Sequence, residues 1–277
     1  MAQFRRLVRV TVGTLRVSSP LHITFDVERS LAGRGKAKVE IANLTRSHQA
    51  EIEAAAGEQL IVEAGYEDER GLEMIFSGRV ARSRHGSSGP TRGTRGDGLD
   101  SVTFVEGTDG GIEMRERRVS ASFAAGVQVA TVVRRCAAAL GLAEGNLEDA
   151  LAGAGAPTLP GGTVLTGSAS GELTRILGSF GLRWTSQLGA LQVLAPGAAL
   201  SVEAVRLTPS TGLVGEAEPG ARGRCRVTAL LTPDLAPGRP VLLESRRATG
   251  RYLVRTARYE GSSTDGPFYV HGDLRAA

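Results

Sequence analysis

Residues 21–28, LHITFDVE, and residues 37–44, AKVEIANL, alternate apolar and polar side chains with a period of two. In the first stretch Ile23, Phe25 and Val27 share one face, and polar or charged side chains occupy the other. Such alternation is typical of strands in a sheet that is buried on one face only. Three further segments show the same pattern: residues 7–12, 60–66 and 100–106. The N-terminal part of the chain is therefore predicted to be a β sheet.

Two interruptions of this β pattern are expected. A short helix is predicted for residues 46–56. Residues 85–98, HGSSGPTRGTRGDG, form a long insertion whose glycine, serine and proline content argues against a regular element. Long loops are often used for binding, so Arg84, Arg92 and Arg95 are candidates for contacting a neighbouring subunit or a phosphate. A solvated hairpin tip is the alternative interpretation.

The middle of the chain differs, because its apolar residues follow helical spacing. Between residues 126 and 140 they recur at i, i+3, i+4 and i+7, and Gly141 is the expected left-handed cap. A second helix is predicted for residues 171–180, with Ser170 as its N-cap and Gly181 at its end. Its buried stripe is expected to consist of Leu173, Ile176, Leu177 and Phe180.

Two strands are expected after the second helix, over residues 182–187 and 190–194. Residues 150–162, between the helices, are rich in alanine, glycine and proline and are predicted to be a loop. The middle of the chain is thus predicted to be a small unit of two helices and a hairpin.

The chain beyond Pro196 and Gly197 returns to short strands and turns. The expected strands are residues 200–207, 225–230, 240–245, 250–259 and 268–274. Strands at this spacing suggest a small barrel or sandwich. We therefore divide the chain into residues 1–110, 111–195 and 196–277, in the order β, α/β, β.

Composition limits the class of protein. The 277 residues suffice for two or three domains. No apolar run is long enough to span a membrane, and the N-terminus does not read as a secretory signal. Two cysteines cannot form a disulfide framework and suggest a reducing compartment. The net charge is +4, with only two lysines among 33 basic residues. Because the arginines are scattered among acids, we attribute them to composition rather than to a nucleic-acid surface.

The sequence predicts no catalytic residue, no cofactor site and no metal site. The four histidines, His22, His48, His85 and His271, lack metal-ligand spacing. Cys136 and Cys225 fall on apolar faces and are interpreted as core residues. A glycosidase would need two converging carboxylates, and nothing marks a pair among Glu113, Glu116, Glu144, Glu148 and Asp149. We interpret the chain as a structural protein rather than an enzyme.

The succession of motifs resembles a known family. FDVE (25–28), IANL (41–44), EAGY (63–66) and IFSG (75–78), with a helix between the second and third, are similar to the first tube domain of phage tail and baseplate hub proteins. The last part of the chain resembles the C-terminal tube domain of hubs from contractile-tailed bacteriophages. The segments that carry this likeness are TGLVGEAE (211–218), VTALLTPDLAPGRPV (227–241), YLVRTARYEG (252–261) and FYVHGD (268–273). Residues 120–194, with GLRW at 181–184, resemble the intervening domain.

The resemblance implies a fold and an assembly. The fold would be mainly β with an α+β insertion, in which two tube-type β-barrel domains flank a small α/β domain. Three chains would form a homo-trimer with pseudo-sixfold symmetry, joining a hexameric tail tube to a trimeric central spike. Expected partners are tail-tube or tube-initiator proteins, the spike protein and, potentially, the tape measure protein. DNA would pass through the lumen without specific binding, and no membrane partner is expected. The protein would be assembled in the host cytoplasm and reside in the tail baseplate of the virion.

Two alternatives remain open. The chain could be the equivalent hub of a tailocin or another contractile injection system. It could also be a peptidoglycan-degrading enzyme of the tail tip, since tail tips often carry such enzymes.

Overall fold

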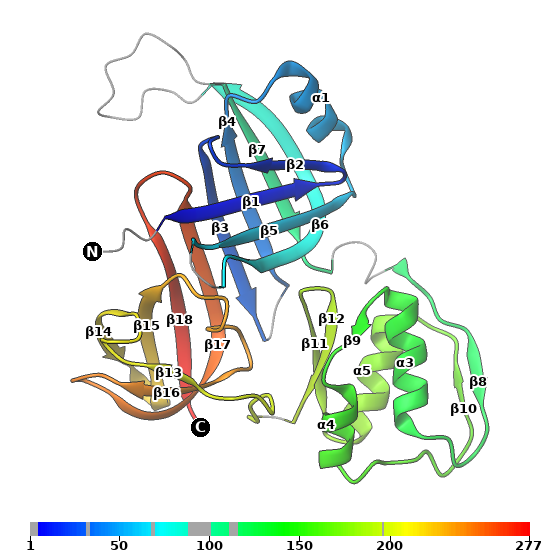
Figure 1. Cartoon of the computed structure of the whole chain (residues 1–277). Coiled ribbons are helices and arrows are strands. Elements are labelled where there is room, and N and C mark those ends of the chain that lie inside the picture. Colours follow the sequence, from blue (N-terminus) through cyan, green and yellow to red (C-terminus); the bar gives the residue numbers. More distant parts are fainter. Residues whose placement is uncertain (1–4, 32–33, 68–69, 88–100, 111–115, 196) are drawn as a thin grey trace.

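The computed structural model describes residues 5–31, 34–67, 70–87, 101–110, 116–195 and 197–277. It is mainly β, as predicted from the sequence, and its elements fall into three groups along the chain (Figure 1). The first group consists of β1 (Arg6–Val12), β2 (Leu15–Ser18), β3 (Ile23–Ser30), β4 (Lys36–Ala42), α1 (Arg46–Ala54), β5 (Gln59–Tyr66), β6 (Leu72–Ser87) and β7 (Ser101–Thr108). The alternation seen in the sequence is realised in β3, where Ile23, Phe25 and Val27 are buried.

The middle group combines helices with short strands. It consists of β8 (Ala121–Phe123), α3 (Val129–Leu140), β9 (Ala143–Glu144), α4 (Leu147–Gly153), β10 (Thr163–Leu165), α5 (Ala169–Ser179), β11 (Arg183–Gln187) and β12 (Ala190–Leu194). Both predicted helices are present. Gly141 ends α3 with a φ of 71°, in the left-handed region that glycine adopts without strain.

Two details of the middle group differ from the prediction. The N-cap of α5 is Ser168, not Ser170: the Oγ of Ser168 accepts a hydrogen bond from the amide of Gly171 at 3.2 Å. Ser170 lies inside the first turn, where its hydroxyl bonds to that of Ser168. In addition, α4 occupies the start of the predicted loop. Burial of Leu147 and Leu151 one turn apart stabilises this helix despite the glycines and alanines around it.

The last group contains only strands and one short 3-10 turn. Its strands are β13 (Val205–Leu207), β14 (Leu213–Pro219), β15 (Arg224–Leu230), β16 (Pro240–Glu244), β17 (Thr249–Ser262) and β18 (Phe268–Ala276). The five expected strands are present, although the first is reduced to β13. Strands β2 and β14 were not expected.

The first and last groups share one sheet. The hydrogen-bonded order is β14-β15-β18-β17-β3-β4-β7-β6-β5-β1-β2, with β16 paired to β17 and β13 paired to β16. The link is the antiparallel pairing of β17 with β3, in which residues 256–262 face residues 30–24. Within the described residues this order ends at β14 and β2 and does not close on itself. The division into domains 1–110, 111–195 and 196–277 stays a prediction.

The buried apolar side chains form two clusters. One joins β strands of the first and last groups, with Tyr259 and Phe268 among its large members. The other lies in the middle group and packs the stripes of α3 and α5 against β12. Leu173, Ile176 and Leu177 are fully or nearly fully buried, whereas Phe180, the C-cap residue of α5, is only partly buried at the edge of this cluster.

Truncating the centre of the middle cluster is expected to destabilise it. Because Leu177 is fully buried, Leu177→Ala should lower the free energy of unfolding by about 2–5 kcal/mol. The matched control is Arg175→Ala, an exposed residue of the same helix, which should change it by less than about 1 kcal/mol. Urea titration measures both, and equal losses in the two variants would contradict the packing described.

Candidate functional site

The junction between β3 and β17 is the candidate site, because there the two ends of the chain meet in one sheet. Arg258 of β17 donates two hydrogen bonds to Asp26 of β3, Nε to Oδ1 at 2.9 Å and Nη2 to Oδ2 at 2.9 Å. The Asp26 carboxylate raises the pKa of Arg258 above its ordinary value. A forked charge pair across two strands fixes their register as well as attracting them.

A buried polar network lies beneath this junction. Arg29 of β3 is only 7% exposed, and its Nη2 donates to Oε1 of Gln187 at 2.9 Å. The side-chain amide of Gln187, in β11, donates in turn to the carbonyl of Pro237 at 3.1 Å. The Arg29 guanidinium also lies 6.0 Å from the ring centroid of Tyr259, whose hydroxyl donates to the carbonyl of Leu235. The network therefore attaches the β11–β12 hairpin of the middle group to β3 and to the segment that precedes β16.

Asp109, just after β7, supplies the opposite charge. Its Oδ1 accepts a hydrogen bond from the Ser186 hydroxyl at 3.1 Å. Burial raises the pKa of Asp109 to about 6, against the opposing effects of the Ser186 hydrogen bond and the Arg29 charge. The other terminal nitrogen of Arg29, Nη1, is buried without a hydrogen-bond partner. Charges so enclosed are costly to separate, which makes this contact a fixed attachment rather than a loose one.

Arg84, predicted as an inter-subunit residue, lies on β6. Its guanidinium carbon is 4.4 Å from the ring centroid of Phe104 on β7, within cation–π range. Arg92 and Arg95 lie outside the described residues. The structure therefore places one of the three predicted residues and does not test whether they act together.

The predicted loop begins later than expected, because β6 continues to Ser87. His85 is part of that strand, and its ring bonds to the Thr103 hydroxyl at 3.0 Å and to the Gln49 carbonyl at 3.1 Å. Pairing with β7 over residues 101–108 holds this end of β6 in place. Sequence periodicity alone did not reveal that β6 extends to Ser87.

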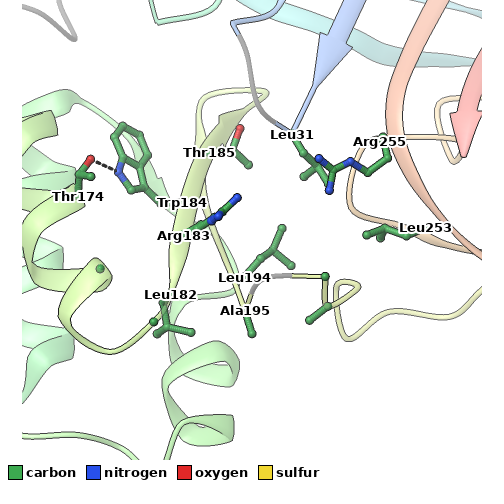
Figure 2. Close-up of a pocket in the computed structure, with 14 residues that line it drawn as sticks. Leu31, Thr174, Leu182, Arg183, Trp184, Thr185, Leu194, Ala195, Leu253 and Arg255 are labelled. Atoms are coloured by element: carbon green, nitrogen blue, oxygen red, sulfur yellow. Dashed lines mark hydrogen bonds between the residues drawn. The ribbon is translucent and has the colours of Figure 1, made fainter. Parts of the chain in front are cut away.

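A cleft of about 630 Å³ separates the middle group from the sheet (Figure 2). Arg183 from β11 and Arg255 from β17 extend into it from opposite sides, and Leu31, Leu194 and Leu253 provide apolar wall. The described residues that line it include no carboxylate, histidine or cysteine.

The two cysteine thiols are not activated as nucleophiles. Burial raises the pKa of the Cys136 thiol to about 11 and also raises that of Cys225, which opposes thiolate formation. Among the residues that the structure describes, no group of three or more His, Cys, Asp or Glu side chains could hold a metal ion. Within the same residues, no helix is long and apolar enough to cross a membrane.

Sequence analysis missed the residues that make the junction: Asp26, Arg29, Asp109, Gln187 and Arg258. Arg258 and Asp26 are 232 positions apart, and no local pattern pairs residues so far apart. Arg29 offered one weak signal. Arg29 follows Ile23, Phe25 and Val27 in the alternation of β3 and therefore lies on the buried face of that strand. A charged residue at such a position is unusual and indicates a buried partner.

The raised pKa of Asp109 makes a pH effect predictable. Its carboxyl group binds a proton more tightly in the folded chain than in the unfolded chain, so protonation below about pH 6 favours folding. Lowering the pH from 7 to 5 should therefore raise the free energy of unfolding of the wild type by about 1 kcal/mol more than that of Asp109→Asn. Urea titration at both pH values measures the difference. Asp234, whose pKa is lowered chiefly by its hydrogen bond with Arg70, titrates below this range. An identical pH response in the two proteins would contradict the burial of Asp109.

Comparisons with known proteins identify the fold. No family model matches the sequence, and no curated protein matches it either. Among solved structures, the tail protein from Neisseria meningitidis MC58 is similar over 98% of this chain and 97% of its own, with a TM-score of 0.61 and 14% identity. The 43 kDa tail protein of prophage MuSo2 from Shewanella oneidensis is similar over 98% of both chains, with a TM-score of 0.63 and 11% identity.

A third structure comes from a secretion system. The E. coli c3393 protein, a component of the type VI secretion system with structural similarity to the T4 tail proteins gp27 and gp5, matches 98% of this chain and 76% of its own. The TM-score is 0.57 and the identity 10%. At such identities the likeness concerns the fold, and this chain has the fold of phage tail proteins.

Proposed function

We propose that this chain is a structural hub subunit of a phage tail baseplate. The observation that carries the proposal is the end-to-end similarity to two tail proteins, which extends over 98% of this chain in each case. The junction described above supports it, because a rigid connection between two β regions suits a ring component better than a catalyst. The proposed parts are residues 1–110 and 196–277 as two tube-type barrel domains and residues 111–195 as the domain between them.

The proposed assembly is a homo-trimer in which three chains contribute six β regions. Such a ring would match a hexameric tail tube on one side and a trimeric central spike on the other, since closed symmetry requires equivalent contacts around the ring. The tape measure protein is a further potential partner, and DNA would pass through the lumen. Arg92 and Arg95 are proposed, with Arg84, to contact a neighbouring subunit.

The equivalent hub of a contractile injection system is the second candidate. The similarity to a type VI secretion component supports it. In both cases the chain acts through protein contacts, and the difference lies in the particle that it completes.

The stoichiometry of the protein tests the proposal. The purified chain, and the chain within its particle, should have the mass of three copies per ring, as measured by native mass spectrometry. The purified protein should release no fragments from peptidoglycan, because the described residues of the cleft supply no acid–base pair. Six copies per ring, or a clear muramidase or peptidase activity, would contradict the proposed hub.

A further inference from the structure

The two β regions repeat one order of strand pairing. In the first region the order is β3-β4-β7-β6-β5-β1, and in the last it is β14-β15-β18-β17-β16-β13. When β2, which has no counterpart in the last region, is left out of the count, strands of equal rank along the chain occupy equal places. Only the outermost pair differs in direction, because β1 is antiparallel to β5 and β13 is parallel to β16. The pairing of β6 with β7 has a register shift between Val80 and Arg82. The pairing of β17 with β18 has one at the matching place, between Val254 and Thr256.

Backbone hydrogen bonds establish the equivalence residue by residue. The amide of Gly57 donates to the Val80 carbonyl at 2.9 Å, and the amide of Gly238 donates to the Val254 carbonyl at 2.9 Å. Both glycines have positive φ, 82° and 89°. Val80 therefore corresponds to Val254, and, two residues beyond each register shift, Arg84 corresponds to Arg258.

The edge of β17 beyond Val254 is paired with a strand and the matching edge of β6 is not, although helix α1 contacts Ser83 and His85 on this part of β6. On β17 the strand β3 pairs with residues 256–262. On β6 the equivalent edge starts at Arg82, and no strand in the described part of the chain pairs with it. Likewise β14, the counterpart of β3, has β15 on one side and no described strand on the other, although the amide of Ala217 donates to the Ser245 hydroxyl at 3.2 Å.

The charges repeat in the same way. Registers through β4 and β15 align Asp26, opposite Lys38, with Glu218, opposite Arg226. Asp26 is ion-paired with Arg258. Glu218, the counterpart of Asp26, is exposed. Within the described residues, neither Glu218 nor Arg84, the counterpart of Arg258, forms an ion pair. The chain thus contains one completed junction and both halves of a second one.

We infer that the free edge of β6 in one copy of this chain binds the free edge of β14 in the next copy, with Arg84 paired to Glu218 across the contact. This rests on the proposed function and specifies the contact that builds its ring. The occupant is a second copy because the two edges reproduce the internal junction in strand order, position and charge. They cannot meet within one chain, since β3 and β17 already lie between them in the sheet.

The ladder between copies is shorter than the internal one. Pro219 lacks an N–H, the amide of Ala217 already donates to Ser245, and β14 has an irregular register between Val214 and Glu218. Backbone hydrogen bonds alone would therefore give a weak contact, which places more of the specificity on the charge pair. Three internal junctions would then alternate with three between copies, and the ring would have no free edge of this kind.

Charge reversal with compensation tests the contact. Arg84→Glu and Glu218→Arg should each raise the protein concentration needed for trimer formation by about tenfold or more, because attraction becomes repulsion at every contact in the ring. The variant carrying both changes should recover wild-type assembly to within about threefold. Arg9→Glu is the matched control, since Arg9 pairs with Glu63 of its own chain on a strand that is paired on both sides. Analytical ultracentrifugation over a range of concentrations gives the values, and circular dichroism verifies folding.

The possible results distinguish a failure of the inferred contact from a failure of the proposed hub function. If the chain forms trimers that neither single reversal weakens beyond Arg9→Glu, or if the two changes together restore nothing, the inferred contact is wrong and the hub stands. If the chain stays monomeric at all concentrations and in its particle, both the contact and the trimeric hub are wrong.

Discussion

The pairing of β17 with β3 is the constraint on which the rest of the structure depends. It turns two β regions that are distant in sequence into one sheet, and it forces their apolar faces into one cluster. The forked bond between Arg258 and Asp26 fixes the register of that pairing, since a slip by one residue would place the two charges on opposite faces of the sheet. Exposed ion pairs contribute little to stability on their own, so their value here lies in alignment.

The middle group is held to this sheet by polar contacts rather than by a shared core. Its apolar cluster is separate from that of the sheet, and the β11–β12 hairpin reaches the junction through Gln187 and Ser186. A buried arginine with an unpaired Nη1 and a carboxyl group of raised pKa is an expensive arrangement. This arrangement fixes how the middle group is oriented on the sheet, because directional hydrogen bonds specify one orientation where an apolar contact would allow several.

Sequence patterns were sufficient for elements and insufficient for their assembly. Period-two alternation located β3, β4 and β5, and helical spacing with Gly141 located α3, because these signals come from residues that are close along the chain. Helix α4 was missed although Asn146, the acidic first turn and the buried pair Leu147 and Leu151 all marked it, because composition was given more weight than spacing. The junction could not be predicted from the sequence, since its side-chain contacts join residues that are 77, 158 and 232 positions apart.

Edge strands explain why a repeated β region is useful in a ring. An unpaired edge invites uncontrolled association, and proteins protect it with charge, proline or an irregular register. The edge of β14 carries all three devices, in Glu218, Pro219 and the shift beside them. The edge of β3 carries the corresponding charge, Asp26, but neither a proline nor a register shift, and it is covered within its own chain. A short charged edge can be met only by a strand with the complementary charge at the right place. The chain therefore pairs the edge of β3, which any strand could join more easily, within itself. It leaves exposed the edge of β14, which accepts only a strand with the complementary charge.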